Sequence, residues 1–451
     1  MITDIRTPQP TPGRGRAGRP SLEGAHGERL LAGWSRTGAP TELPEHLDRH
    51  GPVPSFTAHD GEHPLIEEIA RAGLAGRGGA GFPTAKKLRA VAGAKRTDRV
   101  VVANGMESEP ASAKDKTLLR LAPQLVLDGI VLAADAVGAR QAHLCVAPDT
   151  GLDQRLRELV AERRALGIDP IEITVRTPPH HYVSSESSAL VNWLGGGEAK
   201  PTTTPPRTAE RGVGGLPTLV DNVETLAHVA LIARYGADWF RERGTAESPG
   251  TTLVTLTGAV AEPGVYEIEY GTSVHDILEL AHPVGDAQAV LVGGYFGTWL
   301  PAAEAAALEY SAAGLASAGA SSGAGVLAVL PPHACVLAET ARILEYLGAQ
   351  SSRQCGPCLF GLPATAGDFA QVAFGQPDRE GTERLERRVE LLLGRGACKH
   401  PDGAARLAAS ALRTFAPHVR RHLKWGPCPA AVDARPLLPT PAETIKDGDW
   451  R

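Results

Sequence analysis

Short apolar strands alternate with amphipathic helices over residues 99–176, and this alternation constrains the fold more than any other feature of the chain. Segments 99–103, 142–146 and 171–176 have the composition of buried strands, and the segments between them, 116–137 and 152–165, have helical spacing. Strands that alternate with helices in this way form a parallel sheet covered by helices. The sequence therefore predicts an α/β fold, in which ligands bind beyond the carboxyl ends of the strands.

A glycine-rich loop precedes the first strand, with the sequence Gly-Arg-Gly-Gly-Ala-Gly-Phe-Pro-Thr-Ala-Lys-Lys over residues 76–87. Because glycine has no Cβ, such a loop can turn its amide N–H groups toward an anion. Thr84 is a candidate N-cap for the next helix, which would bring a helix N-terminus and Lys87 to the same place. The pattern predicts binding of a phosphate, as in a nucleotide or a flavin.

The same loop matches G-x-G-x-x-G, but the dinucleotide-binding fingerprint requires a strand before the first glycine. Residues 64–74 have apolar positions at helical spacing instead, so this is no ordinary Rossmann turn. A flexible linker between two helices is the alternative. A linker would have no need of Arg77, Phe82 and Lys87.

The second half of the chain changes character twice. Strand-like segments at 252–258, 264–269 and 289–292 surround a helix at 273–281, which predicts a small α+β module of ubiquitin-like type. Segment 311–325, rich in Ser, Ala and Gly, is predicted to be a flexible surface loop. From 335 onward, segments 339–347, 364–373, 382–393 and 404–423 have helical spacing.

Composition excludes several classes of protein. The chain has 451 residues and a formal net charge of −5, without a long run of one sign, which argues against nucleic acid as a partner. We find no apolar stretch of membrane-spanning length and no signal-peptide pattern, so we expect a cytoplasmic protein. Its six cysteines are then core residues or metal ligands rather than disulfides.

Taken in order, the glycine loop, Asn104-Gly-Met-Glu-Ser-Glu-Pro110, the Glu186 helix start and Asp221-Asn-Val-Glu-Thr-Leu226 resemble the NADH-oxidising flavoprotein subunit of respiratory complex I and of related soluble hydrogenases. The resemblance covers roughly residues 60–430. It implies a Rossmann-like FMN-binding α/β domain, a ubiquitin-like (SLBB-type) module and a C-terminal helical bundle with an iron–sulfur cluster. The predicted boundaries are 1–27 for a disordered segment, 28–245 for the FMN/NADH domain, 246–332 for the SLBB-type domain, 333–435 for the bundle and 436–451 for a tail.

The resemblance also implies roles for individual residues. Those assigned to FMN are Gly76, Arg77, Gly78, Gly79, Lys87, Asn104, Glu107, Glu186, Asp221, Asn222 and Thr225. Phe82 and Glu109 would face the nicotinamide nucleotide, and Cys355, Cys358 and Cys398 would hold a [4Fe–4S] cluster. No side chain is assigned as a general acid or base, because hydride would move directly to the flavin.

Several positions depart from the family pattern. Met106 and Asp221 stand where the family has Asp and Asn, and Arg207 replaces a phenylalanine that helps hold NADH. Arg207 leaves two alternatives. The protein prefers NADPH, since a guanidinium matches the 2′-phosphate, or the nucleotide site is degenerate and a protein such as ferredoxin donates the electrons. Ser352 replaces the first cluster cysteine. The fourth ligand is then Ser352, His400 or Cys428, unless the cluster is lost; His400 is expected on the surface, Cys145 and Cys335 in the core.

The function predicted is oxidation of NADH or NADPH by an FMN flavoprotein that passes single electrons through the cluster to a ferredoxin-like or other electron-accepting protein. The alternative is an FMN-containing adaptor or ferredoxin-linked carrier with a degenerate NADH site. We expect a cytoplasmic protein that can be peripheral to a membrane complex.

Overall fold

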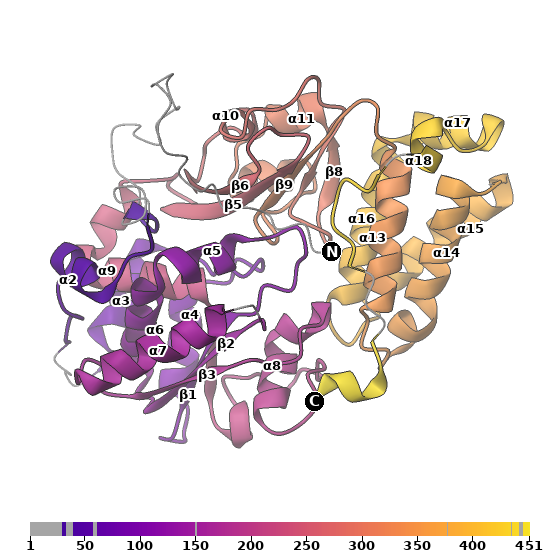
Figure 1. The fold of residues 1–451 in the computed structure, drawn as a ribbon. Helices are drawn as coiled ribbons and strands as arrows, with labels where there is room; N and C mark the ends of the chain where they lie inside the picture. Colours follow the sequence, from indigo (N-terminus) through magenta and orange to yellow (C-terminus); the bar gives the residue numbers. More distant parts are fainter. Residues whose placement is uncertain are drawn as a thin grey trace.

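The computed structural model describes residues 29–32, 39–56, 61–148, 151–376, 378–433, 435–441 and 445–451. The predicted disordered segment 1–27 lies outside these residues. The described chain is a mixed α/β structure in which an α/β part, a second sheet and a helical bundle follow one another along the sequence (Figure 1).

The first sheet is parallel, as predicted. Its strands are β1 (Val100–Gly105), β2 (Gln141–Val146), β3 (Glu172–Arg176) and β4 (Thr218–Asn222), in the order β3-β2-β1-β4. Strand β4 was not predicted. Its last residue, Asn222, is also the N-cap of α9, where its side chain accepts 3.1 Å from the amide of Glu224. The strand order changes direction between β1 and β4, and Asn104 lies opposite Asn222 at their carboxyl ends.

Helices cover this sheet: α2 (Leu43–His50), α3 (Pro64–Ala72), α4 (Thr84–Ala92), α5 (Lys114–Leu121), α6 (Pro123–Val137), α7 (Leu152–Ala165), α8 (Ser187–Leu194) and α9 (Val223–Arg241). The single helix expected over 116–137 is wrong. The chain bends by 97° between α5 and α6, because Pro123 has no N–H to continue α5 and instead begins α6. Gly129 lets α6 approach α9 closely, since a Cβ there would lie 1.9 Å from the carbonyl oxygen of Leu226.

Within the described residues, no single helix has the length and apolar composition needed to cross a membrane. The bent pair α5 and α6 reaches that composition only when taken together. Most of its side chains are buried inside the protein.

The second sheet contains β5 (Thr251–Gly258), β6 (Gly264–Glu269), β7 (Ala289–Val292), β8 (Thr298–Pro301) and β9 (Val326–Leu330), in the order β6-β5-β9-β7-β8. Its central pair, β5 and β9, is parallel and the other pairs are antiparallel. Helices α10 (Val274–Glu279) and α11 (Ala302–Ala306) lie beside it. The flexible loop expected over 311–325 is wrong: it contains α12 (Ala312–Ser317), which Ser311 caps and Leu315 anchors in the core.

The C-terminal part is a bundle of α13 (Val336–Ala349), α14 (Leu362–Phe374), α15 (Arg379–Leu392), α16 (His400–Thr414), α17 (Ala416–Trp425) and α18 (Pro429–Asp433), with a short π-helix, η3 (Pro357–Gly361), before α14. The continuous helix expected over 404–423 is divided at Phe415, and Pro417 lies in the first turn of α17. The bundle packs against β8 through α16 (Figure 1). It also touches the α/β part directly, since the amide of Tyr182 donates 3.1 Å to Gln350 Oε1.

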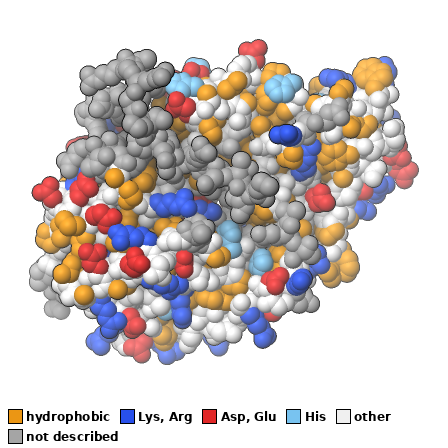
Figure 2. All heavy atoms as spheres, in the orientation of Figure 1, with side chains coloured by type: hydrophobic (Ala, Val, Ile, Leu, Met, Phe, Trp, Pro, Cys, Tyr) orange, Lys and Arg blue, Asp and Glu red, His pale blue; other side chains and the backbone are white. Residues whose placement is uncertain are grey.

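The C-terminal tail returns to the first part of the molecule. Its last turn, η4 (Asp447–Trp450), lies beside α8, next to the chain end marked C in Figure 1. The carbonyl oxygen of Trp450 accepts a hydrogen bond of 2.8 Å from the amide of Ala199, and its ring lies 4.5 Å from that of His181. Acidic and basic side chains are interspersed on the face drawn in Figure 2, as the small net charge suggests.

Candidate functional site

The glycine loop lies at the carboxyl ends of β1 and β4, where the strand order changes direction. A Cβ on Gly78 would lie 3.4 Å from the Cβ of Asn222, and the amide of Arg77 donates 2.8 Å to Thr225 Oγ1 at the start of α9. In open α/β sheets this is the position where ligands bind. The loop and the two strand ends therefore lie together at this edge of the sheet.

The loop is closed by hydrogen bonds at its base, from Gly76 N to Phe82 O at 2.9 Å and from Thr84 N to Leu74 O at 2.9 Å. Within the described part of the chain, residues 77–80 form a turn in which the amides of residues 78–81 donate no hydrogen bond of good geometry. The N–H groups of such a turn can surround an anion. A phosphate of FMN fits this arrangement.

The prediction that Thr84 caps the following helix is wrong. It is the first residue of α4, Pro83 occupies the cap position, and Thr84 Oγ1 is buried without a partner. Proline at the cap has a backbone conformation compatible with a helix start but offers no side-chain acceptor.

Lys87 points from α4 to the end of β4. Its Nζ donates 2.7 Å to the buried carboxylate of Asp221 and 3.1 Å to the carbonyl oxygen of Val220. Burial raises the pKa of Asp221, and the charge and hydrogen bond of Lys87 oppose that rise. The substitution of Asn by Asp at 221 therefore gives Lys87 a counter-ion inside the protein, before any ligand binds.

The segment after β1 is held by its own polar side chains. Asn104 Nδ2 donates 2.8 Å to Ser185 O, which joins the end of β1 to the start of α8. Glu107 has a φ of 36°, and its carboxylate accepts from the amides of Asp115 and Lys116, both at 2.9 Å, at the N-terminus of α5. Met106 is fully buried in an apolar cluster, where an unpaired carboxylate would be costly.

A buried charge network beneath the site was missed by the sequence analysis. Lys114 Nζ lies 2.6 Å from Asp115 Oδ1, 2.8 Å from Glu224 Oε2 and 3.4 Å from Asn222 Oδ1. Burial lowers the pKa of Lys114, but the two carboxylates outweigh that effect and raise it, so the ammonium stays charged. Glu224 also accepts 3.0 Å from the amide of Leu253 in β5. The sequence feature that could have revealed this network is the presence of charged residues in otherwise apolar helical segments.

Arg77 and Phe82 leave the loop in different directions. The Arg77 guanidinium is buried, 3.9 Å from Glu224 and 4.6 Å from the centre of the Tyr270 ring. Its side chain thus links the loop to the second sheet. Phe82 is 45% exposed and is free to contact a planar ring.

Glu109 is buried between the α/β part and the second sheet. Its Oε2 accepts 2.9 Å from Tyr182 OH and 2.9 Å from the amide of Tyr295, and Oε1 accepts 3.4 Å from the amide of Ala111. Burial raises the pKa of Glu109 to about 7 despite these donors. The carboxylate is therefore already hydrogen-bonded to groups of the protein itself.

The three cysteines assigned to the cluster lie within electrostatic range of one another. Burial, followed by the charges of Cys355 and Cys398, raises the pKa of Cys358. Burial raises the pKa of Cys398, the amide of His400 opposes that rise, and the charge of Glu186 adds to it. Glu186 is the N-cap of α8, where it accepts 2.9 Å from the amide of Ser188. The start of α8 is therefore within electrostatic range of Cys398.

The candidates for the fourth cluster ligand lie in different places. Ser352 is buried in the segment before Cys355. His400 is buried and not on the surface as expected; its Nε2 lies 2.8 Å from Leu347 O, and its Nδ1 has no partner. Cys428 is elsewhere, because it lies beside Cys335, which was expected to be a simple core residue. Three thiols with Ser352 or His400 form a donor set that fits an iron–sulfur cluster.

Two family models match the chain. Residues 69–231 match a model described as Nuo51 FMN-binding domain, and residues 338–422 match one described as NADH-ubiquinone oxidoreductase-F iron-sulfur binding region. These ranges contain, respectively, the glycine loop with β1 and β4, and the three cysteines.

Curated relatives and solved structures are also similar. The NADH-quinone oxidoreductase F subunit of Mycobacterium tuberculosis H37Rv is 31% identical over 381 residues, which are 81% of this chain and 86% of the relative. The alpha subunit of the NAD-reducing hydrogenase HoxS of Cupriavidus necator is 36% identical over 242 residues, 51% of this chain and 40% of that protein. A crystal structure of a NAD⁺-reducing [NiFe]-hydrogenase in the air-oxidized state matches with a TM-score of 0.77 and 30% identity, over 91% of this chain and 71% of the other.

Proposed function

This chain belongs to the family of NADH-quinone oxidoreductase F subunits, and on that premise we propose that it oxidises NADH or NADPH with FMN and passes electrons singly through an iron–sulfur cluster to a partner protein. The family is the one that the motifs had predicted, and the chain is an oxidoreductase module. The observation that carries the proposal is the position of the glycine loop at the carboxyl ends of β1 and β4, where the amide of Arg77 donates 2.8 Å to Thr225 Oγ1.

The free amides of residues 78–81 support binding of the FMN phosphate, with Gly76, Arg77, Asn222 and Thr225 holding the loop in place. When bound, FMN supplies acceptance of a hydride and release of single electrons. The protein positions it: Asn104 and Asn222 stand opposite each other at the strand ends, and Lys87 with Asp221 closes one side. Gly79, Glu107 and Glu186 are the remaining residues that we assign to FMN.

For the cluster we propose Cys355, Cys358 and Cys398 as ligands, with Ser352 as the fourth, since it occupies the position of the missing cysteine. Exposed Leu359 and Phe360 follow Cys358 directly on η3. An apolar patch beside a cluster supports docking of an electron-accepting protein there. The chain would then be a peripheral part of a larger complex.

We also propose the predicted domain limits, 28–245, 246–332 and 333–435. The order β6-β5-β9-β7-β8 with a central parallel pair supports the ubiquitin-like, SLBB-type assignment of the middle domain. Exposed Phe82 supports stacking on the nucleotide, and exposed Arg207 supports recognition of a 2′-phosphate.

A second candidate function is an FMN-containing adaptor that takes electrons from a ferredoxin-like protein. One observation favours it: Glu109, assigned to the nucleotide, is hydrogen-bonded to Tyr182 and Tyr295 and is not available to a ligand in this conformation.

An anaerobic titration separates the two candidates. Flavin-loaded protein is titrated with NADPH and with NADH while the visible absorbance of the flavin is followed. Bleaching by either nucleotide supports the dehydrogenase, and a flavin that stays oxidised until dithionite is added supports the adaptor. If NADPH is preferred, Arg207→Ala should remove the preference; an unchanged ratio of the two nucleotides would exclude Arg207 as its cause.

The flavin site has a separate test. A Cβ on Gly79, which has a φ of 94°, would lie 3.0 Å from the carbonyl oxygen of Gly323, so Gly79→Ala must move the loop. With about 1–2 kcal/mol of strain, FMN should bind roughly 5–30-fold more weakly. Gly196→Ala is the matched control, because Gly196 has a φ of 91° and open space around it. Equal FMN affinity in both variants would contradict the assignment of this loop.

A further inference from the structure

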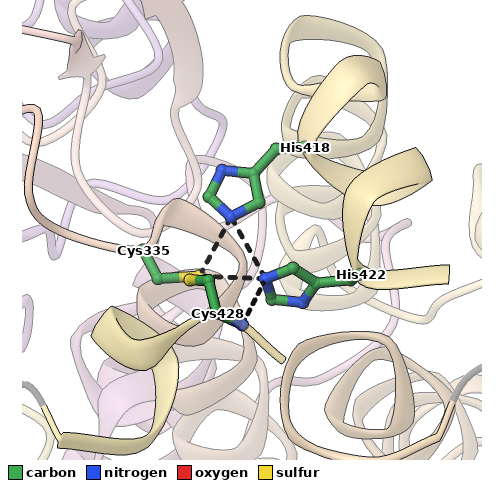
Figure 3. A group of neighbouring side chains, drawn as sticks. All are labelled: Cys335, His418, His422 and Cys428. Carbon is green, nitrogen blue, oxygen red and sulfur yellow. Dashed lines mark hydrogen bonds between the residues drawn. The ribbon is translucent and has the colours of Figure 1, made fainter. Parts of the chain in front are cut away.

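Four potential metal ligands meet near the start of α13, whereas the cluster cysteines follow its end. Cys335 is the residue before α13, His418 and His422 are one turn apart on α17, and Cys428 is the residue before α18 (Figure 3). Their ligand atoms all lie within 4.8 Å of one another. The proposed electron-transfer function uses none of these four side chains.

The distances match a single four-coordinate ion. His418 Nε2 and His422 Nε2 are 3.1 Å apart, and Cys335 Sγ lies 3.7 Å from the first and 3.9 Å from the second. Zinc bonds of about 2.3 Å to sulfur and about 2.0 Å to nitrogen, at tetrahedral angles, place two nitrogens about 3.3 Å apart and a sulfur and a nitrogen about 3.6 Å apart. The spacing is therefore close to that of a tetrahedral zinc site.

The protein already orients one imidazole for metal binding. His422 Nδ1 lies 2.9 Å from the carbonyl oxygen of Val372 in α14, so it carries the proton and leaves the lone pair of Nε2 toward the group. The amide of Cys428 donates 3.2 Å to this same Nε2, which agrees with its acceptor role, and a metal ion would take the place of this donor. Ligating histidines commonly have such a carbonyl partner on the other ring nitrogen.

The thiol of Cys335 is buried directly before the first turn of α13. A divalent cation binds such a thiol as the thiolate, while its proton leaves.

We propose that Cys335, His418, His422 and Cys428 bind one Zn²⁺ in a closed structural site. Two sulfurs and two imidazole nitrogens are a common structural zinc ligand set, and four protein ligands leave no position for a substrate. A surface depression of about 520 Å³, lined by His333, His418, Arg421 and Cys428 among others, gives the ion a route to the site. The ion would fasten α17 and the segment before α18 to the start of α13.

Metal analysis tests this directly. The full chain is expressed with zinc supplied, purified without chelators under anaerobic conditions, and analysed for zinc and iron by mass spectrometry. We expect about one zinc per chain in the wild type. Cys428→Ser and His418→Gln should each lose most of it while iron and flavin contents are unchanged.

Two controls separate this site from the cluster and from general misfolding. Cys145→Ser removes a buried thiol on β2, away from the group, and should keep its zinc. Cys355→Ser should lower iron and keep zinc, so failure of the cluster assignment and failure of the zinc site give different results.

If the variants do not fold, cobalt substitution of the wild type decides the question. Tetrahedral Co²⁺ with thiolate ligands gives strong visible bands and sulfur-to-metal charge transfer. Absence of zinc from the wild type, zinc that is unchanged in both ligand variants, or cobalt bound without a thiolate spectrum would overturn the proposal.

Discussion

Replacement of Glu109 by Gln should make the protein more stable, and increasingly so as the pH rises. The carboxylate is 8% exposed and its pKa is raised by burial from its ordinary value of 4.5 to about 7. A carboxyl group with a raised pKa contributes stability that is fully present below pH 4.5 and is lost as the pH rises through 7. Above pH 7, the folded state must hold a buried negative charge that Gln avoids.

The size of the effect follows from the two pKa values. The total loss of folding stability is about 3 kcal/mol, because each unit of difference between the two pKa values corresponds to about 1.4 kcal/mol. About 2 kcal/mol of this loss falls between pH 5.5 and 8.5, because the rest has already occurred at pH 5.5. A Gln oxygen in the place of Oε2 keeps the bonds from Tyr182 and Tyr295, and only the 3.4 Å contact with Ala111 is lost, at a cost that does not depend on pH.

Urea unfolding of the full chain, followed by tryptophan fluorescence at several pH values, measures this difference. Relative to wild type, Glu109→Gln should gain about 2 kcal/mol between pH 5.5 and 8.5. Glu62→Gln is the control: its hydrogen bond with Arg89 lowers the pKa of Glu62, so the difference should be flat over this range. A flat result for Glu109→Gln, or a loss of stability with rising pH, would refute the assignment of a buried, easily protonated carboxyl group.

Two further substitutions test the cluster and the core. Ser352→Cys supplies the missing thiolate, so it should raise the iron content and slow the loss of iron to a chelator. The control Ser351→Cys, one residue away, should do neither. Equal behaviour of the two variants would exclude position 352 as a ligand. Gly129→Ala should destabilise the protein by about 3 kcal/mol or more in thermal unfolding, because its Cβ would lie 1.9 Å from the carbonyl oxygen of Leu226. Gly367→Ala, in open space on α14, should instead stabilise it slightly, and similar melting temperatures for the two would show that α6 can move away from α9.

The departures from the family pattern have different physical consequences. Met106 is compensated, since it packs among apolar side chains and leaves no unpaired charge. Asp221 changes the site, because it pairs with Lys87 inside the protein. Ser352 leaves a weaker donor where the family has a thiolate. In the site that we propose for FMN, the glycine loop keeps the family pattern, while positions around the proposed ligands differ from it.

Local patterns in the sequence were sufficient for several features. Apolar runs and helical spacing predicted β1, β2, β3 and α7, and the glycine loop could be interpreted because glycine is needed wherever a backbone turns its amides inward. The order of motifs was sufficient for the family. These features depend on residues close together in the chain.

Tertiary structure decided what depends on residues far apart. Burial turned Glu109 into a group that holds two parts together, and packing placed His400 inside the bundle beside Leu347. Chain folding also separated the cysteines into two groups, with Cys335 and Cys428 joined by His418 and His422. Sequence spacing cannot predict such meetings, because they depend on how helices pack and on which polar groups lose contact with water.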